Sequence, residues 1–330
     1  MSKRAFFGHI LRKTGALELR WWTLGPHLYC FNYHRIGDST LCAFDRGVFS
    51  CSAERFREHI RLLQKRFEIL DIARLSYALK RATPRRPMAL ITFDDGYIDN
   101  YELALPILKE TGVSAVFFIP TGFIGGSQIP WWDEIAWSLR NASTDRISLA
   151  GCKDEFDLEP TFMEQTIAAV LELVKVRRDI PMDEQVAEVR EACKPRGSVA
   201  AAGASLFVNA LQISEMRQAG MDIGSHTHTH RVLSHLDADA QEEELGTSKE
   251  ILERLLGEAV DAVAYPVGVR GSYGPETCRI AESLGYRVGF NFIPGVNPLP
   301  TMRPLDLNRL GVETNAAPAQ LKASAAFPWL

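Results

Sequence analysis

The stretch Met88-Ala-Leu-Ile-Thr-Phe-Asp94-Asp95-Gly96 is the most informative part of this sequence. Its first six residues are apolar or β-forming, which is typical of a buried strand. The run stops at two carboxylates and a glycine, and α/β proteins place their sites in the loops after parallel strands. Neighbouring side chains leave a strand on opposite sides, so we expect a turn at Gly96 to redirect one aspartate. Asp-Asp-Gly is also ordinary turn chemistry, and alone it does not decide between a site and a turn.

Strand and helix patterns alternate on both sides of this stretch. The apolar run Leu28–Tyr33 predicts a first strand, and further strands are predicted at 68–72, 113–119, 221–225, 260–265, 286–292 and 310–313. Helices are predicted between most of them, and repeated strand-helix units imply parallel strands in an open sheet or a barrel. The segment 141–210 breaks this rhythm with two helical patterns. We interpret it as a helical insertion within a single domain spanning 1–330.

Composition indicates a globular protein with an ample core. The chain has 330 residues, of which 46% are hydrophobic, and its formal net charge is -4. No part of the sequence gathers the excess of Lys and Arg that nucleic-acid binding requires. No apolar run reaches the ~18 residues of a transmembrane helix. Six scattered cysteines without a Cys-x-x-Cys pair, and no signal peptide, predict reduced thiols and a cytoplasmic address.

The N-terminal segment Met1–Leu24 mixes basic with aromatic and aliphatic residues. The first interpretation is an amphipathic helix packed on the core. The alternative is a basic helix that rests on an anionic membrane, at its inner face for a cytoplasmic protein. Nothing in the sequence indicates the oligomeric state.

Histidines follow another predicted strand. His226-Thr-His-Thr-His230 comes directly after 221–225, and on a helical turn His226 and His230 would face the same side. Two imidazoles and one carboxylate form a catalytic-zinc type of ligand set, although nickel and cobalt suit the same atoms. A second carboxylate would then be free to accept a proton from water. A plain polar loop is the alternative, and His34, directly after the first strand, would by itself more often be a packing residue.

Two motifs carry a resemblance to a known family. Thr92-Phe-Asp-Asp-Gly96 and His226-Thr-His-Thr-His230 resemble the Thr-Phe-Asp-Asp-Gly and His-[Ser/Thr]-x-x-His motifs of the polysaccharide deacetylase superfamily (NodB-homology, carbohydrate esterase family 4). The resemblance extends from about Tyr29 to Glu313. It implies a distorted (β/α) barrel of about seven strands and metal-dependent removal of N-acetyl groups from amino sugars. It also implies Asp94 as the general base, with one divalent metal ion held by Asp95, His226 and His230.

The third motif departs from the family pattern. It normally reads Arg-Pro-Pro-Tyr-Gly or Tyr-Pro-Tyr-Gly, and here it is Tyr265-Pro-Val267-Gly268. The arginine that steadies the base in many members is therefore absent from this motif, and Val267 replaces the tyrosine. The backbone N–H of Val267 can still stabilise an oxyanion, because that role needs no side chain.

The histidine that acts as general acid in this family, protonating the leaving amine, is also missing from its usual position in the sequence. Many members carry it in a C-terminal Leu-x-His motif, but no histidine follows His235. The exopolysaccharide deacetylase branch, which acts on poly-N-acetylglucosamine, looks circularly permuted and carries the acid in a Tyr-His pair after its first strand. Tyr33-His34 is similar to that pair, so the resemblance assigns His34, as an imidazolium, to the protonation of the leaving amine.

The expected function is thus a metal-dependent N-deacetylase acting on an N-acetylated polysaccharide or glycan precursor. One alternative keeps the site and changes the substrate to a lipid-linked sugar, a nucleotide-sugar or a non-sugar amide. Another is an inactive glycan-binding module that kept the fold. The complete set of two aspartates and two histidines speaks against the inactive module, since binding alone needs no base beside a metal.

Overall fold

The computed structural model describes residues 15–81, 84–126, 128–152, 154–177, 180–301, 303–312 and 314–328. The chain divides into two compact units. The first runs up to Gly37 and contains Phe49–Ile124 and the chain from Phe207 onward, and the second contains Asp38–Val48 and Gly125–Leu206.

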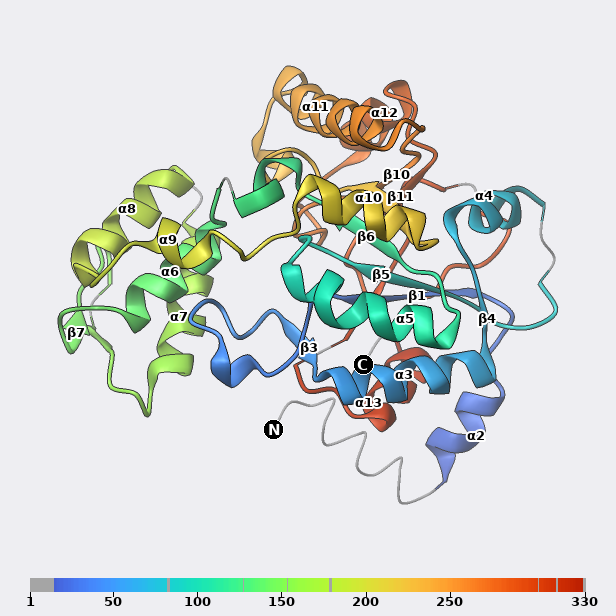
Figure 1. Cartoon of the computed structure of the whole chain (residues 1–330), viewed down its shortest axis with the longest axis horizontal. Coiled ribbons are helices and arrows are strands. Elements are labelled where there is room, and N and C mark those ends of the chain that lie inside the picture. Colours follow the sequence, from blue (N-terminus) through green and yellow to red (C-terminus); the bar gives the residue numbers. More distant parts are fainter. Residues whose placement is uncertain are drawn as a thin grey trace. The chain divides into compact units, whose positions relative to one another are not determined.

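The first unit is built on one curled parallel sheet (Figure 1). Its strands follow the order β11 (Val288–Phe290), β10 (Ala262–Ala264), β9 (Asp222–Ser225), β6 (Val116–Ile119), β5 (Met88–Phe93), β1 (Leu28–Tyr33) and β12 (Leu310–Gly311), and β4 (Glu68–Ile69) pairs with the start of β5. Leu307 forms a parallel bridge with Phe290 of β11, while β12 pairs with β1. The segment 307–311 therefore joins both edges of the sheet, and the predicted distorted barrel of about seven strands is confirmed.

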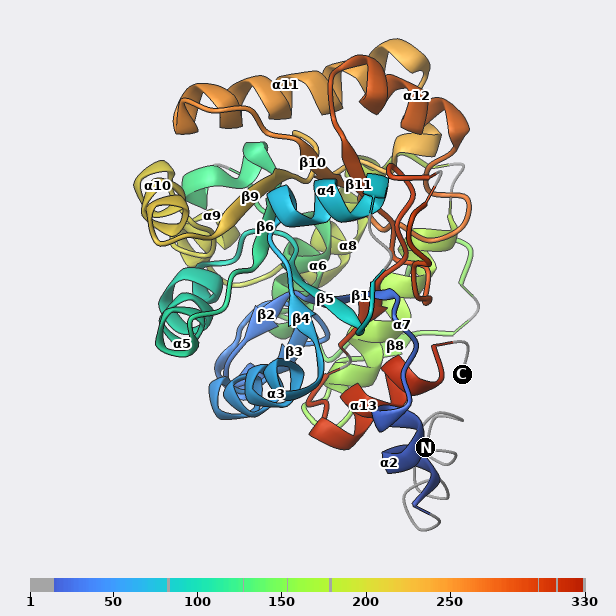
Figure 2. The same ribbon diagram turned by 90° about the vertical axis from the view of Figure 1, so that its right-hand side faces the viewer.

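Most helices of the first unit cover the outer face of this sheet (Figures 1 and 2), whereas α4 (Ile72–Arg81) contributes side chains to the same apolar cluster as the inward-facing strand residues. Ser52 caps the helix Ala53–Arg66, since its side chain accepts a hydrogen bond from the Arg55 N–H. A helix after β12 was not predicted from the sequence. The helices of the first unit are α2 (Ala16–Trp22), α3 (Ala53–Arg66), α4 (Ile72–Arg81), the π-helix Asn100–Ala104 that continues into α5 (Leu105–Thr111), α10 (Ala210–Gln218), α11 (Ala238–Leu256), α12 (Pro275–Ser283) and α13 (Pro318–Ala326).

Successive side chains of each strand point alternately into the barrel and toward the helices, so the buried apolar residues form two clusters. Leu28 and Cys30 of β1 belong to the cluster inside the barrel, whereas Phe31 belongs to the cluster beneath the helices. The next inward positions, Asn32 and Thr92, are polar, and the Thr92 hydroxyl donates to Asn32 Oδ1 over 2.6 Å. The barrel interior thus becomes polar at the carboxyl ends of β1 and β5, directly below the predicted site.

The second unit is helical and broader than the predicted insertion, 141–210. It contains α6 (Trp131–Arg140), α7 (Met163–Val176), α8 (Met182–Cys193), α9 (Val199–Gly203) and the short strands β7 (Arg146–Ile147) and β8 (Phe156–Asp157). It also includes 38–48, because the Asp45 N–H donates to Asp133 on α6 and Arg46 pairs with Glu164 on α7. These contacts connect residues far apart in sequence, so local patterns could not define the boundary.

The described part of the N-terminal segment is a helix packed on the core. Leu17 and Trp21 of α2 are buried, whereas Leu19 and Trp22 are exposed. Residues 1–14 of the predicted helix lie outside the described residues. Within the residues described, no helix combines the length and apolar character needed to cross a bilayer. Membrane contact stays a prediction.

A buried histidine on α3 makes stability depend on pH. His59 Nε2 lies 3.1 Å from the Ala316 carbonyl oxygen and Nδ1 lies 3.2 Å from the Tyr33 hydroxyl, as expected for a neutral ring. Burial lowers the pKa of His59 to about 4. An unfolded histidine has a pKa near 6.5. Between pH 6.5 and pH 4 the unfolded state therefore binds a proton at this residue that the folded state does not bind, and this favours unfolding. We expect His59 to cost about 2 kcal/mol of stability at pH 5 relative to pH 7.

Urea unfolding at pH 7 and pH 5 checks this prediction. The loss of unfolding free energy between the two pH values should be smaller in His59→Gln than in the wild type. Equal losses in the two proteins would show that His59 is not the titrating group.

Candidate active site

The predicted site residues follow strands that end at the same level of the sheet. Tyr33 pairs with Phe93 in the β1–β5 register, and Ile119 pairs with Ser225 in the β6–β9 register. The residues that come next, His34, Asp94 and His226, therefore meet at one end of the barrel. The structure thus brings these three strand ends together.

The turn that separates the two carboxylates of Asp-Asp-Gly begins at Asp95, whereas the sequence predicted it at Gly96. Asp95 itself has a φ of 72°, followed by Gly96 at 68°, so the redirection begins one residue earlier than predicted. Aspartate tolerates the left-handed region better than most residues. The φ of Gly96 favours glycine, and a Cβ there would also lie 3.0 Å from Ile119 Cδ1, which would have to shift slightly.

Three ligand atoms converge on one point at this end of the barrel. Asp95 Oδ1 lies 3.4 Å from His230 Nε2 and 3.6 Å from His226 Nε2, and all three atoms lie within 4.8 Å of one another. Tetrahedral bonds of ~2.0–2.2 Å to a small cation would separate such ligand atoms by roughly 3.3–3.6 Å. The residues present therefore fit one divalent metal ion.

Hydrogen bonding prepares His226 for such a role. Its Nδ1–H donates to the Ala264 carbonyl oxygen over 2.7 Å, which leaves the Nε2 lone pair on the side of Asp95. Burial lowers the pKa of both His226 and His230, so both rings are neutral near pH 7. A neutral imidazole is the form that binds a metal.

The two histidines meet through a turn that is not helical, so that prediction was wrong. Thr227 and His230 both have positive φ values, 65° and 59°. A helical turn has negative φ throughout, and here the left-handed residues bring the two rings to a centroid distance of 4.7 Å. His228 stays outside the metal-ligand group, and its Nδ1 lies 2.9 Å from the Thr121 hydroxyl.

Asp94 is a buried, ionised carboxylate beside these ligands. Its side chain is 3% exposed, with Oδ2 3.9 Å from His226 Nε2. Arg309 Nη1 donates to Oδ1 over 2.7 Å, and Asn32 Nδ2 donates to Oδ2 over 3.1 Å. Burial alone would raise the pKa of this carboxyl, but Arg309, His226 and His34 more than offset it, so the pKa lies well below its usual range. Asp94 can therefore accept a proton at neutral pH.

Arg309 and Asn32 are site residues that the sequence analysis missed. Arg309 is 1% exposed, and its Nε and Nη1 donate to the Asn291 carbonyl oxygen and to Asn32 Oδ1 over 2.6 and 2.7 Å. It enters the barrel just before β12, so an arginine does hold Asp94 although the third motif lacks one. An arginine before a short apolar strand carries no sequence signal that separates it from an exposed one.

His34 lies on the other side of Asp94, with its Nε2 3.9 Å from Asp94 Oδ2. Its side chain is 27% exposed, its backbone bonds to Ser50 and Asn100, and Phe292 packs against the ring edge. Burial lowers the pKa of His34 to about 4. The ring is therefore neutral near pH 7 in this state, which differs from the imidazolium expected from the resemblance.

Val267 occupies a strained position in the loop after β10. Its φ of 63° is unfavourable for a β-branched residue, and its side chain is 38% exposed. Among the residues that the structure describes, none accepts a hydrogen bond from the Val267 N–H. Such a donor is available to a ligand.

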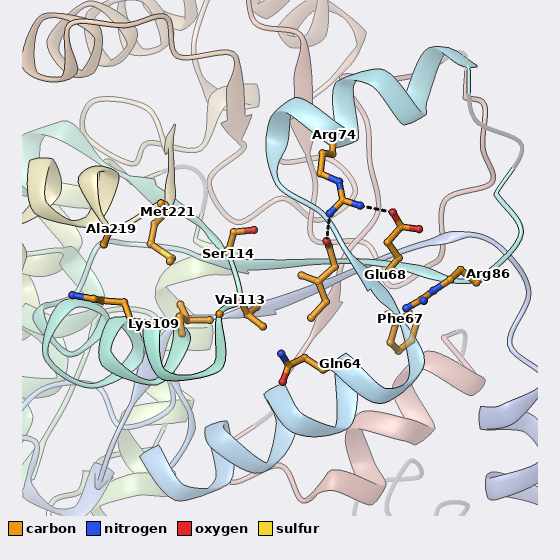
Figure 3. A pocket seen from close by; sticks show the side chains of 14 residues that line it. Gln64, Phe67, Glu68, Arg74, Arg86, Lys109, Val113, Ser114, Ala219 and Met221 are labelled. Carbon is orange, nitrogen blue, oxygen red and sulfur yellow. Dashed lines mark hydrogen bonds and ion pairs between the residues drawn. The ribbon is translucent and has the colours of Figure 1, made fainter.

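A cavity of about 730 Å³ in the first unit lies away from these groups (Figure 3). Its lining includes residues that precede or begin strands, such as Glu68 of β4, Ser114 before β6 and Met221 before β9, together with residues of α3, α4 and α5. Its lining contains none of the candidate site residues. The cavity is at the amino-terminal end of the barrel, opposite to the candidate site.

The fold and the site together define a class. A parallel barrel whose strand ends place an ionised carboxylate and an imidazole beside a convergent Asp-His-His group is an α/β barrel with a candidate metal-binding site. A family model described as polysaccharide deacetylase matches residues 81–154 and 188–289, more than half of the chain. The chain belongs to the polysaccharide deacetylase family.

A curated relative of this chain supports the family assignment. YxkH of Bacillus subtilis (strain 168), whose name places it among polysaccharide deacetylases, is 26% identical over 212 residues, which are 64% of this chain. The match covers 47% of YxkH, so the chain spans about half the length of that relative.

Solved structures share the fold at low sequence identity. The Streptococcus pyogenes deacetylase PplD, in complex with acetate, has a TM-score of 0.58 at 20% identity and covers 91% of this chain and 97% of its own. IcaB from Ammonifex degensii has a TM-score of 0.57 at 19% identity, with coverages of 92% and 98%. A de-N-acetylase from Aggregatibacter actinomycetemcomitans has a TM-score of 0.56 at 17% identity, with coverages of 90% and 99%.

Proposed function

We propose that this protein is a metal-dependent N-deacetylase that removes acetyl groups from N-acetylated amino sugars in a polysaccharide or glycan precursor. The observation that carries the proposal is the ionised, Arg309-bound Asp94 beside the convergent ligand atoms of Asp95, His226 and His230. Family membership supports a carbohydrate substrate. The descriptions of two neighbours, one bound to acetate and one called a de-N-acetylase, support loss of an acetyl group.

Asp95, His226 and His230 would hold one divalent ion, with zinc favoured by the ligand types and nickel or cobalt suited to the same atoms. When bound, such an ion polarises an amide carbonyl and lowers the pKa of water. Asp94 is placed to accept the proton of the attacking water, because Arg309 and Asn32 keep it ionised and oriented.

The remaining groups act on the amide itself. The Val267 N–H donates to the oxygen that becomes negative when water adds to the carbonyl carbon. His34 then protonates the departing amine, so that the C–N bond breaks to leave acetate and a free amino sugar. Since His34 is neutral at rest, it must gain a proton before it delivers one. The water proton that Asp94 accepts supplies it through a bridging water, because Asp94 Oδ2 and His34 Nε2 lie 3.9 Å apart, too far for direct transfer.

Acetate release from N-acetylglucosamine oligomers tests the function. The purified protein would be assayed after chelation and after addition of zinc, cobalt or nickel, with metal content measured on the same samples. We expect acetate and free amine only from the metal-loaded protein. His226→Ala should lose metal and activity, whereas His228→Ala, a matched control in the same loop, should retain metal. Metal-loaded protein that releases no acetate from oligomers, lipid-linked sugars or nucleotide-sugars would contradict the proposal.

Replacing His34 by alanine should lower kcat on the amide substrate by ~10²–10⁴-fold, the usual contribution of one proton-transfer group. Metal content should not change. An activated ester such as 4-nitrophenyl acetate has a leaving group that needs no proton, so its hydrolysis should fall much less. If amide and ester hydrolysis fall equally, or if neither falls, His34 is not the acid.

A further inference from the structure

The turn between the two candidate metal ligands is held in an unfavourable backbone conformation. Thr227 and His230 both lie in the left-handed region without being glycine. Such conformations persist only where the surrounding structure stabilises them strongly. The contacts that hold this turn therefore decide how far apart the His226 and His230 side chains lie.

A buried carboxylate from α11 provides those contacts. Glu244 is 7% exposed, and its Oε2 accepts hydrogen bonds from the backbone N–H groups of His228 and Thr229 over 3.0 and 2.8 Å. Its Oε1 accepts a hydrogen bond from the Thr229 hydroxyl. Three hydrogen bonds from the turn therefore meet at this one side chain.

The other contacts of the turn engage different groups. The N–H groups of Thr121 and Gly122, after β6, donate to the carbonyl oxygens of Thr227 and His228 over 3.2 and 2.7 Å. The His230 N–H donates to the Thr227 hydroxyl over 3.2 Å. Glu244 is thus the acceptor for the two central N–H groups, which are partly buried and have no other acceptor among the described residues.

The position of Glu244 is fixed by the helix that carries it. Asp237 caps the start of α11 by accepting a hydrogen bond from the Ala240 N–H, which stabilises the first turn of the helix. Ser248, one turn after Glu244 on the same face, accepts a hydrogen bond from the Ser225 hydroxyl at the end of β9 over 2.8 Å. One face of α11 therefore holds both the strand that ends before His226 and the turn that leads to His230.

We propose that Glu244 is a positioning residue for the metal centre, holding His226 and His230 at the spacing that lets both bind one divalent cation. This inference rests on the metal-binding part of the proposed function. Outer-shell partners of metal ligands typically contribute 10–100-fold to metal affinity. Glu244 acts on the backbone between the ligands rather than on an imidazole.

The test compares Glu244→Gln with Glu243→Gln, an exposed neighbour on the same helix. Zinc affinity would be measured by competition with a chromophoric chelator, and hydrogen exchange of the His228 and Thr229 amides would be measured on the metal-free proteins. A glutamine side chain has the same size but one acceptor oxygen fewer. We expect Glu244→Gln to bind zinc ~10–100-fold more weakly and to exchange both amides faster, with Glu243→Gln unchanged.

The outcomes separate this inference from the proposed function. A wild-type protein that binds no metal contradicts the proposed function. A wild type that binds zinc while Glu244→Gln binds it equally well overturns the role of Glu244. If Glu244→Gln does not fold, Thr229→Val removes only the hydroxyl donor, and it should weaken zinc binding several-fold. Unchanged affinity in that variant would also overturn the inference.

Discussion

Asp94→Asn is expected to lower kcat for acetate release by ~10²–10⁴-fold while metal binding is retained. An asparagine has nearly the shape of aspartate, and its Oδ1 can still accept the hydrogen bond that Arg309 donates to Asp94 over 2.7 Å. Its amide nitrogen cannot take a proton from water, so the base is lost while the metal-ligand set remains. Steady-state kinetics and metal content of the same samples measure the two effects separately.

Asp95→Asn is the matched control for this substitution. The two aspartates are adjacent, yet only Asp95 Oδ1 lies within the group of convergent ligand atoms. Asp95→Asn should therefore weaken metal binding, and added metal should restore part of its activity, whereas added metal should not rescue Asp94→Asn. Near-normal kcat in Asp94→Asn would remove Asp94 from the role of base.

The second large effect is expected from Arg309→Met, which leaves the Asp94 carboxylate buried without its principal counter-charge. Removing one partner of a buried ion pair typically costs ~3–5 kcal/mol of stability. Among the groups that lower the pKa of Asp94, Arg309 has the largest effect, so the pKa of Asp94 should rise in the variant. A base must be ionised to act, so the acid limb of the kcat/KM profile should move to higher pH.

Thermal or urea unfolding and the pH profile together check the Arg309 prediction. Arg309→Lys is the informative comparison, since it keeps the charge but loses the geometry that lets Nε reach Asn291 while Nη1 reaches Asp94. Arg309→Lys should shift the acid limb of the kcat/KM profile less than Arg309→Met does. In the Asp94→Asn background, Arg309→Met should cost less stability than it does in the wild type. An acid limb at the wild-type pH in Arg309→Met would show that Arg309 does not control the base.

The architecture and the candidate site residues could be predicted from the sequence alone. Residues 28–33 and 88–93 form strands with the predicted bounds, because buried parallel strands appear as short continuous apolar runs. The groups predicted from the strand ends, Asp94, Asp95, His226, His230 and His34, meet at one end of the barrel, because parallel strands in register bring their carboxyl ends together.

The contacts that hold those groups in place depend on the three-dimensional fold and could not be predicted from the sequence. Arg309 reaches Asp94 across 215 residues and Asn32 across 277, and no local spacing predicts which arginine of a chain will be buried. The same holds for Glu244, which meets the His226–His230 turn only because α11 packs beside it. The left-handed turn itself was missed, because polar residues four apart also fit a helix. The hydrophobic periodicity of a sequence indicates which face of a helix or strand is buried. It does not indicate which helices and strands the barrel brings side by side, and these contacts depend on that.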